Sequence, residues 1–252
     1  EGWTEKPGAG CGPWKMVKWS REGVTMEPNA LYRDPSVVRI KDFEYRFIGE
    51  EATKLAALKA GEVDVIDQVP FEQVEGLESD PRFKIQYSRA LDMMEQNMNC
   101  GEPPFDNPEA RKAAMYAVDR QTIVDTVLGG AAEVDIQPQP EGYPGHNPDL
   151  KPFPYDPEKS KKILQDAGFE LPVKVRLIQP NAWFPKVLEV PQAIAAQMKP
   201  AGFDVEIVVL EGGAFTAGRK GSDYNFAFMQ YGSSLDPDGP YTGRILNDNW
   251  GT

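Results

Sequence analysis

The chain has 252 residues and a formal net charge of -12 at pH 7, because 39 Asp and Glu outnumber 27 Lys and Arg. Apolar side chains make up 40% of the residues and the mean hydropathy is -0.49, as in ordinary globular proteins. This length allows one large or two small domains. The negative charge argues against partners such as nucleic acid or an anionic lipid surface.

The sequence is poor in metal-ligating side chains. It has two cysteines, Cys11 and Cys100, and one histidine, His146. Zinc-finger and His-rich sites need more soft ligands than this, so we expect no metal. The cysteines fit two buried thiols in a reducing compartment or a disulfide in an exported protein. No apolar run approaches the roughly 18 to 20 residues that span a bilayer.

The first ninety or so residues predict strands that alternate with short helices. Apolar and polar side chains alternate in KMVKW and VVRIKDFEYRF, as in half-buried strands. We expect strands at residues 15–19, 37–47, 63–65 and 84–88. Helices are expected at residues 50–60, with a stop at Gly61, and at residues 71–78.

The stretch PPFDNPEARKAAMYAVDRQTIVDTVLGG (residues 103–130) predicts a proline-rich turn and then a long helix ending at Gly129 and Gly130. Asp106 or Asn107 can cap the helix, and Pro108 fits its first turn. Apolar side chains recur at helical spacing: Ala110, Ala113, Ala114, Ala117, Val118, Ile123, Val124, Val127 and Leu128. We interpret the stretch as a packing helix without a chemical role.

From Asp156 onward, predicted helices and strands alternate. Helices are expected at residues 156–168, 187–201 (interrupted at Pro191) and 214–220, and strands at residues 173–178, 203–210 and 224–231. This order implies a mainly parallel sheet with helices on its faces. Such sheets bind ligands at the carboxyl ends of their strands. The best candidate for a ligand-facing loop is therefore YGSSLDPDGPYTG, residues 231–243.

Four blocks of the sequence, in this order, resemble one known family. They are GCGPWKMVKW, LYRDPSVVRIKDFEYRFIGEEATKLAALKAGEVDVIDQVP, NMNCGEPPFDNPEARKAAMYAVDRQTIVDTVLGG and LKPFPYDPEKSKKILQDAGF. They are similar to the GTGPY, A-L-x-x-G-E-V-D, P-P-F-x-D-x-R-V-R and PYDPEKAK blocks of the peptide/nickel-type (family 5) extracellular solute-binding proteins of ABC importers. The resemblance runs from about Cys11 to Trp250, which makes it far more specific than a single motif.

The resemblance implies an α/β fold of the periplasmic-binding-protein type II, with mixed, mainly parallel sheets and two lobes around a hinge. Residues 1–91 would be part of lobe I, residues 92–230 lobe II, and residues 231–252 the start of a return to lobe I. Family members are longer, so we expect a fragment with an incomplete lobe I. Residues 103–130 would be scaffold in lobe II.

The resemblance also implies a function. We expect a monomeric, non-enzymatic protein in the periplasm or at the cell surface. It would capture a small-molecule or peptide ligand and deliver it to an ABC permease in the membrane. A sensory or chaperone relative of the same fold is an alternative.

The resemblance points to candidate ligand-binding residues: Tyr231, Gly232, Ser233, Ser234, Asp236, Arg219, Asn181, Trp183 and Asn97. Peptide-binding members have G-W-x-x-D-Y-x-[DE]-P in the segment that matches residues 229–237, and its aspartate pairs with the peptide ammonium. Here Tyr231 stands at the aromatic position and Ser234 at the acidic one. Hydroxyl groups suit sugars, polyols or modified amino acids at least as well as peptides, although Asp236 could take the acidic role.

The other candidates have plain structural interpretations beside the functional ones. Arg219 falls where some members place a ligand-facing arginine, but it could be a solvated helix-end cation. Asn181 and Trp183 follow the carboxyl end of a predicted strand, where Trp183 could simply cap the surface. Asn97 lies on the presumed hinge strand.

Other chemistries find little support. The stretch 236–239 begins like a calcium loop, but Pro240 occupies a ligand position and no glutamate closes the loop. Asp64 and Asp67 lack a proton-donor partner. There is no Gly-rich phosphate loop, so we expect no cofactor, and no Gly-x-Ser-x-Gly elbow. An α/β hydrolase, the alternative enzyme class, needs a histidine base, and His146 lies in a polar turn that we expect to be exposed.

In a chain that resembles an exported protein, Cys11 and Cys100 are expected to form a disulfide. Each lies where the family usually has a small hydroxyl residue.

Overall fold

The computed structural model describes residues 10–88, 92–137, 139 and 141–232. The chain forms two compact units, Glu1–Pro70 and Phe71–Thr252. The division lies upstream of the predicted lobe boundary between Leu91 and Asp92, and the assignment of lobes remains a prediction. Within the described residues, no helix is both long and apolar enough to span a membrane.

Unit 1 contains an antiparallel sheet in the order β1 (Trp14–Trp19), β2 (Gly23–Pro28), β3 (Phe43–Arg46). The register aligns Met16, Met26 and Phe43 across the three strands, so these apolar side chains share one face. On the other face, Lys15 and Glu27 form an ion pair of 2.9 Å. The predicted strand at residues 15–19 is confirmed.

The rest of unit 1 corrects several predicted boundaries. Helix α1 (Glu51–Ala60) ends at Gly61 as predicted, and this glycine has a φ of 74°, in the left-handed region. The predicted strand at residues 37–47 is too long, because Asp34 caps a short 3-10 turn, Pro35–Val37, at its start. The strand predicted at residues 63–65 does not form, and the side chain of Val65 is 82% exposed.

Unit 2 begins with a 3-10 turn (Phe71–Gln73) and α2 (Val74–Glu78), which confirm the predicted short helix. The strand predicted at residues 84–88 is absent from the described structure. A four-stranded sheet follows, in the order β4 (Asp92–Met98), β7 (Phe226–Gly232), β5 (Val173–Pro180), β6 (Phe203–Leu210). Strand β5 is parallel to β6 and β7, and β4 is antiparallel to β7. The predicted mixed, mainly parallel α/β sheet is confirmed.

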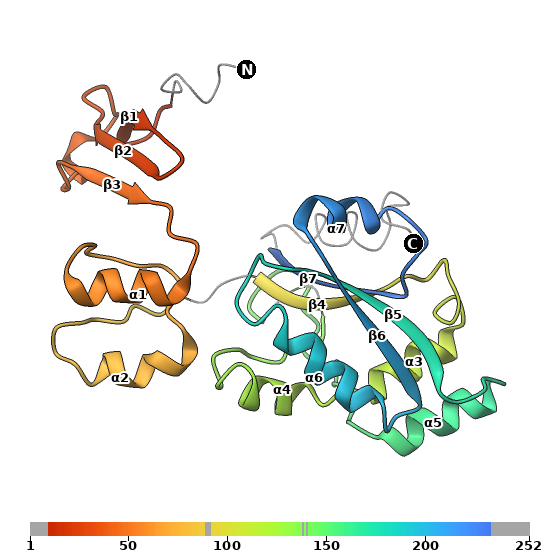
Figure 1. Ribbon diagram of the computed structural model, residues 1–252. Coiled ribbons are helices and arrows are strands. Elements are labelled where there is room, and N and C mark those ends of the chain that lie inside the picture. Colours follow the sequence, from red (N-terminus) through yellow and green to blue (C-terminus); the bar gives the residue numbers. More distant parts are fainter. Residues whose placement is uncertain (1–9, 89–91, 138, 140, 233–252) are drawn as a thin grey trace. The chain divides into compact units, whose positions relative to one another are not determined.

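The two faces of this sheet differ in how they are covered. Helices α3 (Pro108–Tyr116), α4 (Arg120–Thr126), α5 (Pro157–Asp166) and α6 (Glu189–Met198) lie on one face, and α7 (Gly212–Gly218) lies on the other (Figure 1). The larger core fills the first face and includes Leu177, Phe105 and Phe228. A smaller cluster on the α7 face is built around Phe215, which is fully buried. Among the described residues, α7 is the helix that covers this second face.

The long helix predicted within residues 103–130 is wrong, because α3 ends at Tyr116 and α4 begins at Arg120. Asn107 caps α3 and accepts a hydrogen bond from the Glu109 N–H at 2.9 Å. Asp119 caps α4 and accepts from the Thr122 N–H at 3.0 Å. The Gln197 amide of α6 also bonds both backbone groups of Asp119, at 2.7 and 3.3 Å. The predicted helix is therefore divided at Asp119, whose backbone is held by the side chain of Gln197 from a distant part of the sequence.

The remaining helices follow the sequence pattern closely. Asp156 caps α5 and accepts from the Lys159 N–H at 2.9 Å, and Pro157 begins the helix. The sequence predicted that Pro191 interrupts helix α6, and that prediction is wrong. Pro191 lies in the first turn of α6, and the helix continues past it. A backbone N–H in the first turn has no partner within the helix, so proline is tolerated there.

The cap at Asp119 predicts a measurable dependence of stability on pH. Hydrogen bonds from the backbone and hydroxyl groups of Thr122 hold the pKa of the Asp119 carboxyl below its ordinary value. The stabilisation is therefore present above the unfolded pKa of about 4 and is lost as the pH falls through the folded value. We expect Asp119→Ala to lower the free energy of unfolding by about 1 kcal/mol at pH 7, as measured by urea titration.

The difference from the wild type should shrink progressively below about pH 4. Asp125→Ala is the matched control, because Asp125 lies on the same helix, is exposed, and accepts only from the Gln121 side chain. Equal effects of the two substitutions at pH 7 would contradict the role of Asp119 as a cap.

The Cys11–Cys100 disulfide remains a prediction. Both thiols are free and exposed in the structure, and they belong to different units. In protein isolated under oxidising conditions, alkylation followed by mass spectrometry should find no free thiol until a reductant is added. A bridge that closes so long a loop is expected to stabilise the fold by about 4 to 5 kcal/mol. Full alkylation of both cysteines without reductant would rule the bridge out.

Candidate functional site

The carboxyl ends of the parallel strands meet at one edge of the unit 2 sheet. Strands β5, β6 and β7 end there at Pro180, Leu210 and Gly232, and β4 begins there at Asp92, opposite Gly232. A side chain at Gly232 would place its Cβ 3.1 Å from an Asp92 carboxylate oxygen, so glycine permits this close approach. The topology thus brings segments from distant parts of the chain to one place.

Two predicted site residues share the α7 face of the sheet. In the β4–β7 register, Tyr231 lies opposite Met93 and Asn97 lies opposite Ala227. Both fall on the face where Ala227, Met229 and Tyr231 pack with Phe215. Tyr231 is partly exposed and Asn97 is exposed, so both are open to a solute.

Arg219 joins this face from the end of α7. Its Nη1 lies 2.9 Å from the sulfur of Met229, and the Asn97 Nδ2 lies 3.3 Å from the same sulfur. The Arg219 guanidinium also lies 5.6 Å from the centre of the Phe215 ring. Arg219 is only 8% exposed, so it is not the solvated helix-end cation of the alternative interpretation.

Burial governs the electrostatics around Arg219. Loss of hydration lowers the pKa of Arg219, and the nearby Tyr224, Glu95 and Tyr231 act in the opposite direction. Burial also raises the pKa of Tyr224, so its hydroxyl stays protonated and donates to the Arg219 carbonyl at 3.1 Å. Of the three groups that favour the cation, Glu95 is the carboxylic acid.

Glu95 lies beside these candidates, and the sequence interpretation missed it. It lies on β4 opposite Met229, and its Oε1 accepts a hydrogen bond from the Asn97 Nδ2 at 3.2 Å. The sequence signal that could have identified Glu95 is its spacing from Asn97, because residues two apart on a strand point to the same face. Once Asn97 is a candidate on a predicted strand, Glu95 is its neighbour on that face.

Asn181 and Trp183 lie in the loop after β5. The Asn181 N–H donates to the Leu210 carbonyl at 2.8 Å, which fixes the loop to the end of β6. The Trp183 ring packs edge-on against Phe215, with centroids 5.6 Å apart, and the residue is 56% exposed. Trp183 and Arg219 therefore contact one buried ring, Phe215, and Trp183 keeps a large exposed surface. Ser233, Ser234 and Asp236 lie outside the described residues.

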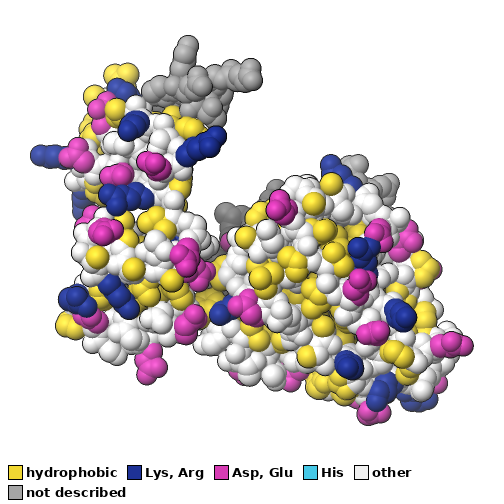
Figure 2. Space-filling view, in the orientation of Figure 1, with side chains coloured by type: hydrophobic (Ala, Val, Ile, Leu, Met, Phe, Trp, Pro, Cys, Tyr) yellow, Lys and Arg dark blue, Asp and Glu magenta, His cyan; other side chains and the backbone are white. Residues whose placement is uncertain are grey.

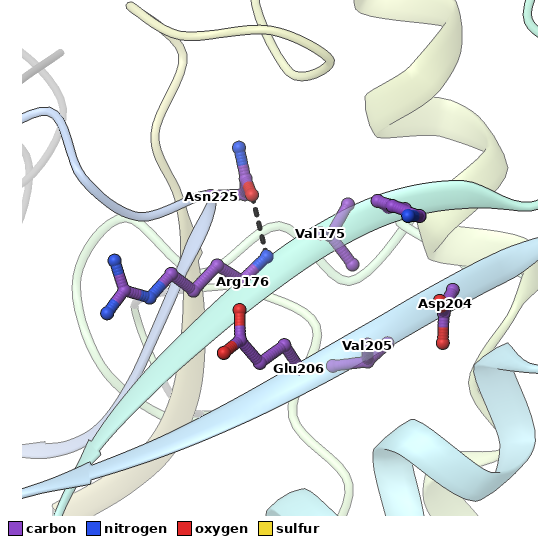
Figure 3. A pocket seen from close by; sticks show the side chains of 7 residues that line it. Val175, Arg176, Asp204, Val205, Glu206 and Asn225 are labelled. Atoms are coloured by element: carbon purple, nitrogen blue, oxygen red, sulfur yellow. Dashed lines mark hydrogen bonds between the residues drawn. The ribbon is translucent and has the colours of Figure 1, made fainter.

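A shallow hollow of about 350 Å³ lies at the other end of β5 and β6, where the strands begin. Figure 3 shows Arg176 and Glu206, from these two strands, among its lining side chains. Arg176 bonds the Asp223 carboxylate, and the Asn225 Oδ1 accepts from the Arg176 N–H at 2.6 Å. The hydrogen bond that Arg176 donates to the Asp223 carboxylate, together with the charges of Asp223 and Glu206, raises the pKa of Arg176. The Arg176 charge is thus paired with that of Asp223, away from the carboxyl edge of the sheet.

Other sequence candidates have structural partners. The ring Nδ1 of His146 lies 2.9 Å from the Gln139 carbonyl and the residue is partly buried, so the expected full exposure is wrong. Asp67 forms an ion pair with Lys54 at 2.8 Å. Among the residues that the structure describes, no group of three or more His, Cys, Asp or Glu side chains could hold a metal ion.

The surface charges are mixed in sign. On the face of the molecule drawn in Figure 2, Lys and Arg side chains are scattered among Asp and Glu, with apolar side chains between them on both units. This pattern is typical of a solvated protein surface.

Comparison with known proteins identifies relatives over the whole chain. The family described as "Bacterial extracellular solute-binding proteins, family 5 Middle" matches residues 1–252. The glutathione-binding protein GsiB of Escherichia coli (strain K12) is 25% identical over 250 residues, which cover 96% of this chain and 48% of GsiB. The chain thus spans about half the length of the curated relatives it matches.

Solved structures agree with the fold. DppA from Helicobacter pylori, in complex with the peptide STSA, is 27% identical with a TM-score of 0.78, and the match covers 92% of this chain and 45% of DppA. AgaA from A. tumefacien R10, in complex with agropinic acid, is 29% identical with a TM-score of 0.72, covering 87% and 45% of the two chains. The fold is that of the type II periplasmic binding proteins, and the chain belongs to the family 5 bacterial extracellular solute-binding proteins.

Proposed function

We propose that this chain is part of the solute-binding component of an ABC importer. It captures a small polar solute between two lobes, in the periplasm or at the cell surface, and delivers it to a permease in the membrane. The protein works as a monomer, and lobe closure around the solute is the event that the permease recognises. The family match along the whole chain supports this function.

The observation that carries the proposal is the convergence of polar and aromatic side chains on the α7 face, beside the carboxyl edge of the sheet. Tyr231 and Asn97 offer a hydroxyl and an amide there, and Trp183 offers an exposed ring beside Phe215. Ligand sites combine aromatic surface with a few polar groups in this way. We infer that Tyr231 and Trp183 pack against the solute and that Asn97 and Asn181 orient it.

The proposed class of solute follows from the uncharged hydroxyl groups of the candidate site. Ser234 stands where a peptide-binding member would have an aspartate for the ammonium, and Tyr231 and Ser233 supply further hydroxyls. We propose an oligopeptide, a sugar or a modified amino acid, with Asp236 as the group that could hold an ammonium. The named relatives bind glutathione, the peptide STSA and agropinic acid, which are small polar solutes of this kind.

We expect Tyr231→Ala to weaken binding of the solute by about tenfold, because an aromatic contact of roughly 1 kcal/mol or more is lost. Calorimetric titration of the full-length gene product with peptide and sugar panels gives the dissociation constants. Tyr155→Ala is the control, because Tyr155 is a 40% exposed tyrosine of the same unit that lies just before α5. Equal affinities of the wild type and Tyr231→Ala would place the solute elsewhere.

The variant Ser234→Asp tests the specificity. It should not improve the affinity for the native solute, because that solute carries no cation that needs residue 234. The same titrations should show a gain for peptides with a free amino terminus. Tight binding of unmodified peptides by the unmutated protein would contradict the proposed specificity. It would indicate that Asp236 or another carboxylate pairs with the peptide ammonium.

We also expect no turnover of the bound solute, because the described part of the candidate site combines no nucleophile with a histidine base. Incubation of the protein with each binding probe, followed by mass spectrometry of the probe, should recover it unchanged. Hydrolysis or group transfer that is lost on substitution of one polar site residue would establish an enzyme instead.

A further inference from the structure

The loop after β5 carries two consecutive aromatic residues that pack on different faces of the unit 2 sheet. Trp183 packs against Phe215, which belongs to the cluster on the α7 face, with ring centroids 5.6 Å apart. Phe184 belongs to the larger core on the other face, where its ring centroid lies 5.6 Å from that of Phe228. Two neighbouring side chains thus fix the loop to both sides of the sheet.

The two aromatic residues differ in their exposure. Phe184 is 7% exposed, whereas Trp183 is 56% exposed. The Trp183 indole Nε1 lies beside the start of α7, because a Cβ at Gly212 would be 4.0 Å from it. Trp183 therefore contacts the protein with part of its indole and presents the rest to solvent. Its orientation depends on the backbone that carries it.

The backbone on both sides of this pair is constrained. The Asn181 N–H donates to the carbonyl of the last β6 residue at 2.8 Å. Pro185 has a fixed φ and also restricts the backbone of Phe184 before it. Lys186 has a φ of 60°, in the left-handed region that favours glycine, and its carbonyl accepts from the Val190 N–H at 3.1 Å. Such a conformation persists only where the surrounding structure holds it, and Phe184 is the buried residue of the segment 181–186.

We infer that Phe184 is a positioning residue, whose place in the core holds Trp183 in the orientation in which a solute meets the indole. This inference rests on the proposed function, in which Trp183 packs against the solute. Phe184 is buried in the core on the face opposite α7, so its effect on binding passes through Trp183. An aromatic surface that is formed in advance favours binding, because less conformational entropy is lost when the solute arrives.

The first experiment needs no solute. The full-length gene product is labelled with 5-fluorotryptophan, and Trp183→Phe identifies the fluorine resonance of Trp183. In the wild type this resonance should be narrow and displaced from that of the free amino acid, because the Phe215 ring lies beside the indole. Phe184→Ala should broaden it and move it toward the free value. An unchanged resonance in a folded Phe184→Ala protein would overturn the inference.

The second experiment measures affinities for trialanine, N-acetylated trialanine and glucose by calorimetric titration. Trp183→Ala should weaken the binding of each probe that binds by about tenfold, as expected for the loss of an aromatic contact, and Phe184→Ala should do so by a similar factor. The double variant should bind no more weakly than Trp183→Ala alone, because Phe184 acts through Trp183. Losses that multiply in the double variant would contradict the positioning role.

Leu164→Ala is the matched control. Leu164 is fully buried in the same core but belongs to α5, which packs against α3. Its truncation should lower the stability about as much as Phe184→Ala does, because both leave a cavity. It should change neither the Trp183 resonance nor the affinities. A control that alters this resonance as strongly as Phe184→Ala would show a general loosening of the core and overturn the inference.

A milder variant covers the case in which Phe184→Ala does not fold, as judged by circular dichroism. Phe184→Leu keeps part of the apolar volume but lacks the ring, so it should move the Trp183 resonance in the same direction by a smaller amount. An unchanged resonance in Phe184→Leu would then decide against the inference.

The two experiments separate this inference from the proposed function. Equal affinities of the wild type and Trp183→Ala for a bound probe would remove Trp183 from the site, which overturns the inference and leaves the importer function standing. Failure of the wild type to bind any probe would count against the proposed function. The spectra without solute would still decide whether Phe184 positions Trp183.

Discussion

The antiparallel pairing of β4 with β7 is the constraint on which the candidate site depends. It joins residues from Asp92 to Met98 with residues from Phe226 to Gly232, which lie far apart in the sequence. This pairing places Glu95 opposite Met229 and puts Asn97 on the face of Tyr231. Because β7 is also parallel to β5, the same strand aligns the β5–β6 pair and its carboxyl ends with the start of β4. Polar groups that no local sequence pattern connects thereby form one cluster.

Phe215 is the second element that organises the site. The ring is fully buried between α7 and the sheet, Trp183 packs against it edge-on, and the Arg219 guanidinium lies 5.6 Å from its centre. A cation beside an aromatic ring is stabilised by the electrons of the ring. The ring also holds Trp183 at the surface by one edge, which leaves the rest of the indole exposed. One apolar side chain therefore positions both a buried charge and an exposed aromatic group.

Much of unit 2 could be predicted from sequence, because its signals are local. These signals are the largely buried run of β5, the apolar and polar alternation at the start of β6, the caps at Asn107 and Asp156, and Pro157 at the start of α5. The failures have distant causes. The break before α4 depends on Gln197, 78 residues from Asp119, and Glu95 gains its importance only through strand pairing. The strand expected at residues 63–65 has a suitable pattern, but a strand also needs a partner to pair with, and the described residues provide none.

Two arginines, Arg176 on β5 and Arg219 at the end of α7, lie in different surroundings, and their charges therefore have different consequences. Arg176 is bonded to Asp223, whose side chain is 89% exposed, so water screens that interaction and it contributes little. Arg219 is buried, so its charge acts through a medium of lower dielectric constant, and a neighbouring carboxylate changes its surroundings far more. The ion pair of Arg176 and Asp223 is therefore a solvated surface feature toward the amino ends of the strands. Beside the carboxyl edge, by contrast, the Arg219 guanidinium is shielded from water and lies against Phe215 and the Met229 sulfur.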